Sequence, residues 1–127
     1  MSFPFTVRAR KLRKEMRMAN SKKALFIVMA KMTPDKEEAF NKWYNEEHLP
    51  RVLERHPGVL TGRRYKIIEG IDEYQYMAVY EYESYESLEK NQSSEVTQQL
   101  IREYDAAFGK GGRHHVRAIE LKSLIVG

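Results

Sequence analysis

The residues best suited to chemistry lie in one stretch, from Trp43 to Pro50, with His48 near its end. A neutral imidazole beside an aromatic-lined pocket can accept a proton from an activated C–H or O–H group. Tyrosines across the pocket can hydrogen-bond the oxyanion that develops. This chemistry would support an isomerase, a cyclase or a lyase that needs no cofactor. The alternative is that His48 bonds carbonyl groups at the end of a helix, or anchors a ligand without catalysis.

Further candidate side chains lie in segments expected to be strands. Arg63 and Arg64 are adjacent, so they point to opposite faces and only one of them can reach a given cavity, where it could clamp a carboxylate or phenolate. The segment over 74–82 carries a row of tyrosines, including Tyr76 and Tyr80, on one face. That row could line a pocket for a planar ligand or pack the core and an interface. Of the pair at 114–115, His115 could enter the pocket opposite His48.

The elements that must position these residues begin with an apolar run over 24–31, which is typical of a strand. Thr33 is a good N-cap and Pro34 suits the first helical position, so a helix is predicted to begin there. One face of that helix carries Phe40, Trp43, Tyr44, Glu47 and His48. Pro50 removes an amide donor, so we expect the helix to break or kink at 48–49 before a short helical turn at 51–55.

The remaining pattern predicts two more strands, a second helical region and a last strand. The strands over 58–69 and 74–82 form a hairpin, the helical region over 85–108 is interrupted near 91–94, and the last strand covers 114–125. The order β-α-β-β-α-β is that of an α+β, ferredoxin-like fold with a four-stranded antiparallel sheet and helices on one face. We expect residues 23–127 to form this single domain, after a flexible basic extension over 1–22.

Both faces of the predicted sheet are apolar, although two helices can cover only one of them. A soluble monomer rarely exposes a contiguous apolar patch of several hundred Å². The sequence therefore predicts a homodimer in which the sheets pack face to face, most simply with two-fold symmetry.

The composition narrows the class of partner. The formal charge is +4, but residues 1–17 contain six basic side chains and one acidic side chain, so the rest of the chain carries about −1. A nearly neutral folded part argues against nucleic-acid binding by the domain. The chain has no cysteine, which excludes thiolate sites, and no apolar run long enough to span a bilayer, so a cytoplasmic location is expected.

Three other sites are argued against by their spacing. Consecutive histidines at 114–115 face opposite ways in a strand and lack a companion ligand set, so no protein-ligated metal site is expected. The glycine-rich segment 109–113 follows a helix and precedes a strand, which is the reverse of a phosphate-binding loop. The strand over 74–82 lacks the aromatic signature of an RNA-recognition module.

Several of these motifs together resemble the dimeric α+β barrel superfamily, and are similar in particular to its EthD-like and related uncharacterised members. The resemblance rests on the run from Trp43 to Pro50, Pro57-Gly58-Val59, Arg63-Arg64-Tyr65 and the strand from Tyr76 to Glu81, and covers about residues 23–125. It implies a ferredoxin-like protomer, dimerisation through the sheets and a small-molecule cavity between sheet and helices.

The resemblance makes His48 the candidate acid/base or polar anchor, with Trp43, Tyr44, Arg64 and Tyr65 as companions. Members of the superfamily include isomerases, cyclases, dehydrohalogenases, cofactor-free monooxygenases, haem-dependent enzymes and proteins without an assigned activity, so the fold fixes no reaction. The leading hypothesis is cofactor-free proton transfer on a compact aromatic, lactone or polyketide-like molecule. The alternatives are a non-catalytic ligand-binding or interaction protein and haem binding through His48 or His115.

Overall fold

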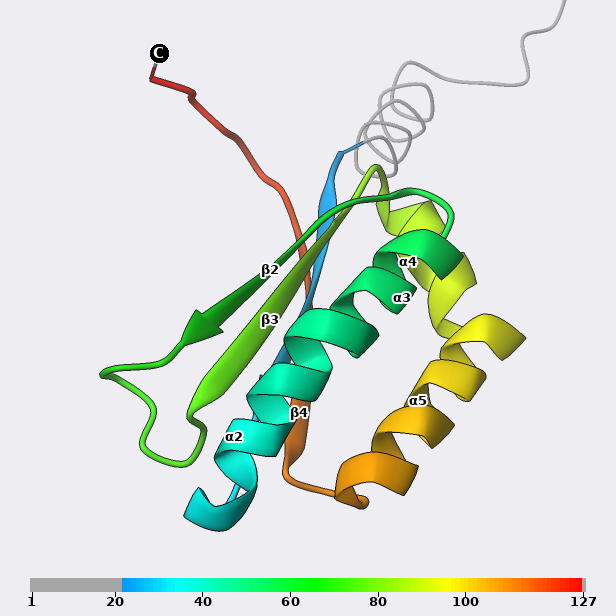
Figure 1. Ribbon diagram of the computed structural model, residues 1–127. Coiled ribbons are helices and arrows are strands. Elements are labelled where there is room, and N and C mark those ends of the chain that lie inside the picture. Colours follow the sequence, from blue (N-terminus) through cyan, green and yellow to red (C-terminus); the bar gives the residue numbers. More distant parts are fainter. Residues whose placement is uncertain (1–21, 127) are drawn as a thin grey trace, which may run out of the picture.

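The computed structural model describes residues 22–126, which form a four-stranded antiparallel sheet with all helices on one face (Figure 1). The elements in chain order are β1 (Ala24–Ala30), α2 (Pro34–Trp43), η1 (Tyr44–His48), α3 (Leu49–Arg55), β2 (Val59–Lys66), β3 (Tyr76–Tyr82), α4 (Tyr85–Gln92), α5 (Glu95–Phe108) and β4 (Arg113–Ile119). The strands are ordered β2-β3-β1-β4. The predicted ferredoxin-like α+β fold is confirmed, while nearly all of the predicted extension over 1–22 lies outside the described residues.

The first helix does not break before Pro50, so that part of the prediction was wrong. Helical backbone continues from α2 through η1 into α3, and within η1 the amide of Leu49 bonds the carbonyl of Tyr44, five residues back. Proline lacks an amide donor and its ring crowds the carbonyl four residues earlier. A widened π-turn accommodates both effects without ending the helix, and such turns are frequent at functional sites.

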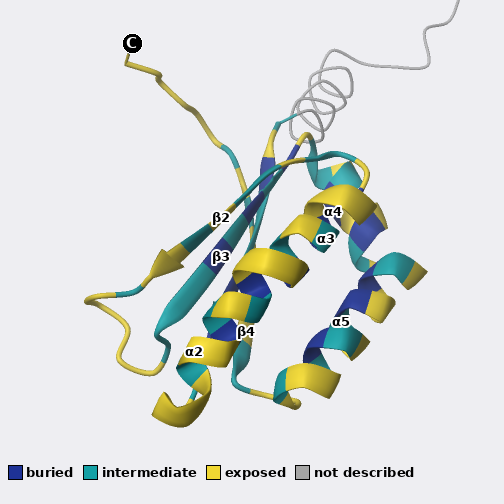
Figure 2. Ribbon diagram, viewed as in Figure 1, coloured by how far each residue is buried: buried dark blue, intermediate teal, exposed yellow. Residues whose placement is uncertain are grey.

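The core lies between the sheet and the helices. Side chains alternate along each strand, so Ala24, Val28 and Ala30 of β1 face the helices and are buried. In Figure 2 the buried positions of the helices gather on the sides that face the sheet and one another. The helices supply the rest of the cluster, above all Phe40 and Tyr104, which are also buried.

The other face of the sheet is covered by no described helix. Its central positions are apolar and only partly exposed, namely Leu25, Ile27, Met29, Met77, Val79, Val116 and Ala118. We call this set the open sheet face. Among the helices of residues 22–126, none combines the length and the apolar character needed to cross a membrane.

Candidate functional site

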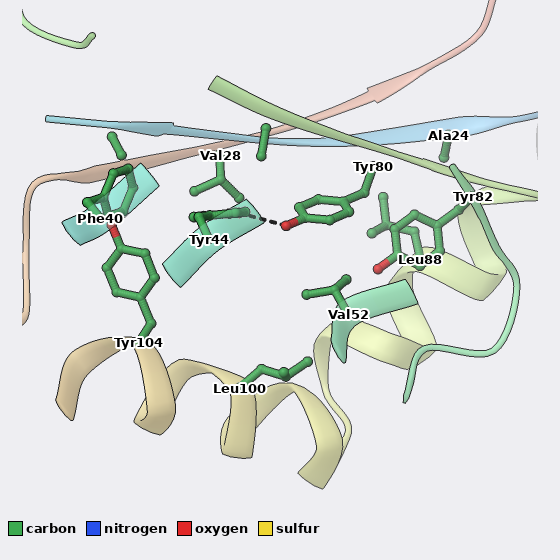
Figure 3. Close-up of a cluster of buried hydrophobic side chains, with 12 residues drawn as sticks. Ala24, Val28, Phe40, Tyr44, Val52, Tyr80, Tyr82, Leu88, Leu100 and Tyr104 are labelled. Atoms are coloured by element: carbon green, nitrogen blue, oxygen red, sulfur yellow. Dashed lines mark hydrogen bonds between the residues drawn. The ribbon is translucent and has the colours of Figure 1, made fainter. Parts of the chain in front are cut away.

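A cavity of about 110 Å³ lies between the sheet, the first helix and α5. It is lined by Phe26, Val28, Tyr44, His48, Val52, His56, Tyr80, Tyr82, Gln92, Thr97, Leu100, Ile101, Tyr104, Arg113 and His115. Most of these side chains are apolar or aromatic, and a few polar groups converge among them, as in a typical small-molecule site. Figure 3 shows how Tyr80 of β3 and Tyr44 of η1 approach each other across this region, with Leu100 of α5 on the far side.

His48 is a buried wall of this cavity. The residue is 8% exposed, and its Nδ1 atom has no hydrogen-bond partner among residues 22–126. The ring stacks on Trp43, with 4.7 Å between ring centroids and 17° between the planes. These residues are five apart, so the π-turn, which closes over five residues, brings them to the same side of the helix. Burial lowers the pKa of His48 to about 4, with Glu103 opposing and Arg113 assisting the shift, so the imidazole is neutral near pH 7.

Two buried phenols form the second polar feature of the cavity. The hydroxyls of Tyr44 and Tyr80 are 2.6 Å apart and hydrogen-bonded (Figure 3). The guanidinium of Arg64 lies 4.5 Å from the ring centroid of Tyr44 and is held by Asn41 and Asn45 through bonds of 3.0 and 2.9 Å. Burial raises the pKa of Tyr44 to about 12 and that of Tyr80 well above its usual value, so both phenols are protonated.

A chain of hydrogen bonds closes the end of the cavity near α4. Thr97 donates its hydroxyl proton to the carbonyl of Asn91, so it must accept from Nε2 of His56, 3.0 Å away. The other ring nitrogen of His56 then carries no proton and accepts from the hydroxyl of Tyr82 at 2.8 Å. Burial lowers the pKa of His56, in keeping with this neutral tautomer. The network leaves His56 with no free proton to offer a ligand.

The charged wall of the cavity comes from β4. The guanidinium of Arg113 forms an ion pair with Asp105 of α5 and lies 4.1 Å from the ring centroid of Tyr104. The hydroxyl of Tyr104 is buried and has no hydrogen-bond partner in the described part of the chain. His115, next along the same face of β4, is exposed, which places it at the rim of the cavity.

The predicted site residues divide into three groups. His48, Tyr44, Tyr80 and His115 line the same cavity, and Trp43 lies directly behind the imidazole. Arg64 and Tyr76 lie beside the cavity around Phe40, where Tyr76 donates to Glu37 at 3.2 Å. Tyr65 is exposed and pairs with Met77, so it lies on the opposite face of the sheet.

The predicted site residues do not include six polar residues that the fold brings to the cavity, namely His56, Tyr82, Gln92, Thr97, Tyr104 and Arg113. Two of them could have been found from the sequence, because Tyr82 lies on the same face of its strand as Tyr80, and Tyr104 lies on the apolar stripe of α5. The others depend on contacts between segments that are distant in sequence. In the described part of the chain, no three histidine, aspartate or glutamate side chains lie close enough together to hold a metal ion.

A protein-family model described as a domain of unknown function, DUF4286, matches residues 23–116. No curated protein matches the chain. Several solved structures are similar in fold. An ethyl tert-butyl ether D (EthD) family protein from Bacillus halodurans is 18% identical, with a TM-score of 0.62 over 79% of this chain and 99% of that one.

A hydroxynitrile lyase from Passiflora edulis is 10% identical, with a TM-score of 0.58 over 83% of this chain and 99% of that one. A protein of unknown function from Bacteroides fragilis, described as dimeric with a ferredoxin-like fold, is 10% identical, with a TM-score of 0.55 over 77% and 96% of the two chains. Sequence identities this low show a similarity of fold and no more. As a similarity of fold, the predicted resemblance to EthD-like proteins is confirmed.

Proposed function

This chain belongs to the DUF4286 family, a domain of unknown function, and we propose that it binds a compact small molecule beside His48 and moves a proton on it without a cofactor. The observation that carries this proposal is the buried Nδ1 atom of His48, which lies in the wall of the cavity and has no hydrogen-bond partner among the residues that the structure describes. A buried polar atom without a partner costs free energy in the empty protein, and a ligand that bonds it recovers that cost.

The protonation state of His48 decides which chemistry it can do. With a pKa near 4 it rests as the neutral base, and the imidazolium formed after proton abstraction is a strong acid that returns its proton readily. That behaviour suits an isomerase, cyclase or lyase, in which a proton is removed and then delivered to another atom. The hydroxyls of Tyr44 and Tyr80 line the same cavity and would stabilise the oxyanion formed meanwhile.

The second candidate is a ligand-binding protein without catalysis. It is favoured by the same low pKa, because a base this weak takes a proton from a substrate less easily than an ordinary histidine would. The fold relatives include a lyase, which supports small-molecule chemistry on this scaffold but assigns no reaction to this chain.

The proposal includes a homodimer formed through the open sheet face. This face is apolar and is left uncovered by the described helices, and one fold relative is described as dimeric. Sheet-to-sheet packing would leave the cavity of each protomer on the helical side, where it can bind ligand independently.

Native mass spectrometry of the purified protein, followed by turnover assays on the molecule that it retains, tests the proposal. We expect His48→Gln to lower turnover by about 10²- to 10⁴-fold while ligand binding changes only a few-fold. Tyr65→Phe, on the opposite sheet face, is the control and should leave both unchanged. Unchanged turnover in His48→Gln would remove the proton-transfer role from His48, and a retained ligand that the parent chain does not turn over would leave the binding protein.

A further inference from the structure

We propose that the cavity selects a compact, uncharged molecule with an acceptor oxygen of the carbonyl type, and that the Tyr44–Tyr80 pair supplies the donor that selects it. This inference rests on the proposed small-molecule function and deepens it by naming the class of ligand. It follows from the number of protons in the pair, the charge of the cavity wall and the size of the space.

The two phenols carry two protons but share only one hydrogen bond. One hydroxyl donates to the other across 2.6 Å, so the accepting hydroxyl must direct its own proton elsewhere. Within residues 22–126, neither hydroxyl has another hydrogen-bond acceptor in the structure. Tyr44 and Tyr80 are 3% and 2% exposed and both line the cavity, so the spare proton is buried beside the ligand space.

The position of Arg64 indicates which phenol holds the spare proton. Its guanidinium lies 4.5 Å from the ring centroid of Tyr44, and a cation against the ring face makes that phenol the more acidic of the two. The more acidic hydroxyl is the better donor, so Tyr44 donates to Tyr80. The O–H of Tyr80 is then the group offered to a ligand, and its complement is an acceptor oxygen.

The cavity wall disfavours ionic ligands of either sign. Burial shifts the pKa of His48 down to about 4 and that of Tyr44 up to about 12, so the same surroundings oppose a positive and a negative charge. Arg113 is the one permanently charged side chain among the lining residues, and its charge is met by Asp105. A neutral molecule therefore loses less hydration on entry than an ion does.

The volume limits the ligand further. A dry cavity of about 150 Å³ accommodates benzene in a well-studied engineered protein. The space here is about 110 Å³, so a molecule slightly smaller than benzene fits without rearrangement. A polyketide-sized compound would extend beyond this space.

The experiment uses four probes with the same number of non-hydrogen atoms: cyclobutanone, methylenecyclobutane, cyclobutylammonium and propanoate. Dissociation constants are measured by NMR titration of the full chain near pH 7. We expect cyclobutanone to bind about two- to tenfold more tightly than methylenecyclobutane, as one net hydrogen bond provides, and both ions to bind more weakly than cyclobutanone.

Phenylalanine variants then locate the donor. Tyr44→Phe and Tyr80→Phe each keep one phenol proton without an acceptor, so each should retain a preference for cyclobutanone, whereas the double variant should lose it. Tyr65→Phe removes a hydroxyl on the opposite face of the sheet, away from the cavity, and is the control, with the preference retained.

The outcomes separate this inference from the proposed function. Equal binding of cyclobutanone and methylenecyclobutane, tightest binding of an ion, or a preference that survives in the double variant would overturn the inference while leaving a small-molecule site. Binding of none of the four probes would overturn the proposed function and the inference with it. Circular dichroism of each variant confirms that the compared chains are folded.

Discussion

Tyr44 and Tyr80 act as one unit, because among residues 22–126 the hydroxyl of each has the other as its one hydrogen-bond partner. Removing one oxygen leaves a buried hydroxyl without a partner, whereas removing both leaves two phenylalanines of nearly the same shape. The first change costs the desolvation of a polar group, and the second can be almost neutral.

We therefore expect Tyr44→Phe and Tyr80→Phe each to lower the free energy of unfolding by about 1–3 kcal/mol, and the double variant to lose clearly less than the sum. Urea denaturation of the four chains measures this cycle. Strictly additive losses would show that the two hydroxyls do not depend on each other.

His48 makes stability depend on pH in a defined window. Its pKa is about 4 in the folded chain against 6.5 for an unperturbed histidine, so the unfolded chain binds more protons between these values. The free energy of unfolding should thus be insensitive to this group above pH 6.5, fall by up to about 3 kcal/mol as the pH drops to 4, and fall no further below it. Buried His56, whose pKa is also lowered, acts in the same direction.

Urea midpoints measured from pH 8 to pH 4 test this dependence. His48→Gln should remove most of the histidine-linked loss. An unchanged slope in His48→Gln would mean that the imidazole is hydrated in the folded state.

At the scale of elements, the sequence could predict which face of the first helix is buried but not its exact winding. Phe40, Tyr44 and His48 recur every four residues, which correctly places them on the core side. The stack of Trp43 on His48 requires the π-turn of η1. This turn keeps the helix continuous although Pro50 lacks an amide donor. The periodicity of the apolar residues does not reveal this π-turn.

The start of α5 is an element whose stability can be tested separately. Ser94 is its N-cap and accepts a hydrogen bond from the amide of Thr97, while the neighbouring Ser93 bonds only carbonyls of the preceding helix. We expect Ser94→Ala to lower the free energy of unfolding by about 1 kcal/mol, and Ser93→Ala to change it by less than about 0.5 kcal/mol. Equal effects in thermal or urea unfolding would contradict the capping role.

At the scale of the whole molecule, strand order and helix placement could be predicted because each element has a clear period and clear boundary residues. The cavity could be predicted only in part. Its wall joins His56 of the turn between α3 and β2, Thr97 of α5 and Arg113 of β4, which meet only after α5 packs over the sheet. The sequence indicates a polar residue at each position but not the distances between them, so the hydrogen-bond chain through His56 had to be observed.

The open sheet face leads to a prediction for the assembled molecule. Several hundred Å² of apolar surface at about 25 cal/mol per Å² corresponds to an association term on the order of 10 kcal/mol before the entropic cost of binding is subtracted. Light scattering at micromolar concentration should therefore give twice the chain mass of 15.0 kDa.

Val79→Glu places a charge at the centre of this face and should give the mass of one chain. Ile68→Glu, 90% exposed and outside the strands, should leave the dimer intact. A single-chain mass for the parent protein would contradict the interface, and because the cavity lies on the helical face, ligand binding should survive in the Val79→Glu monomer.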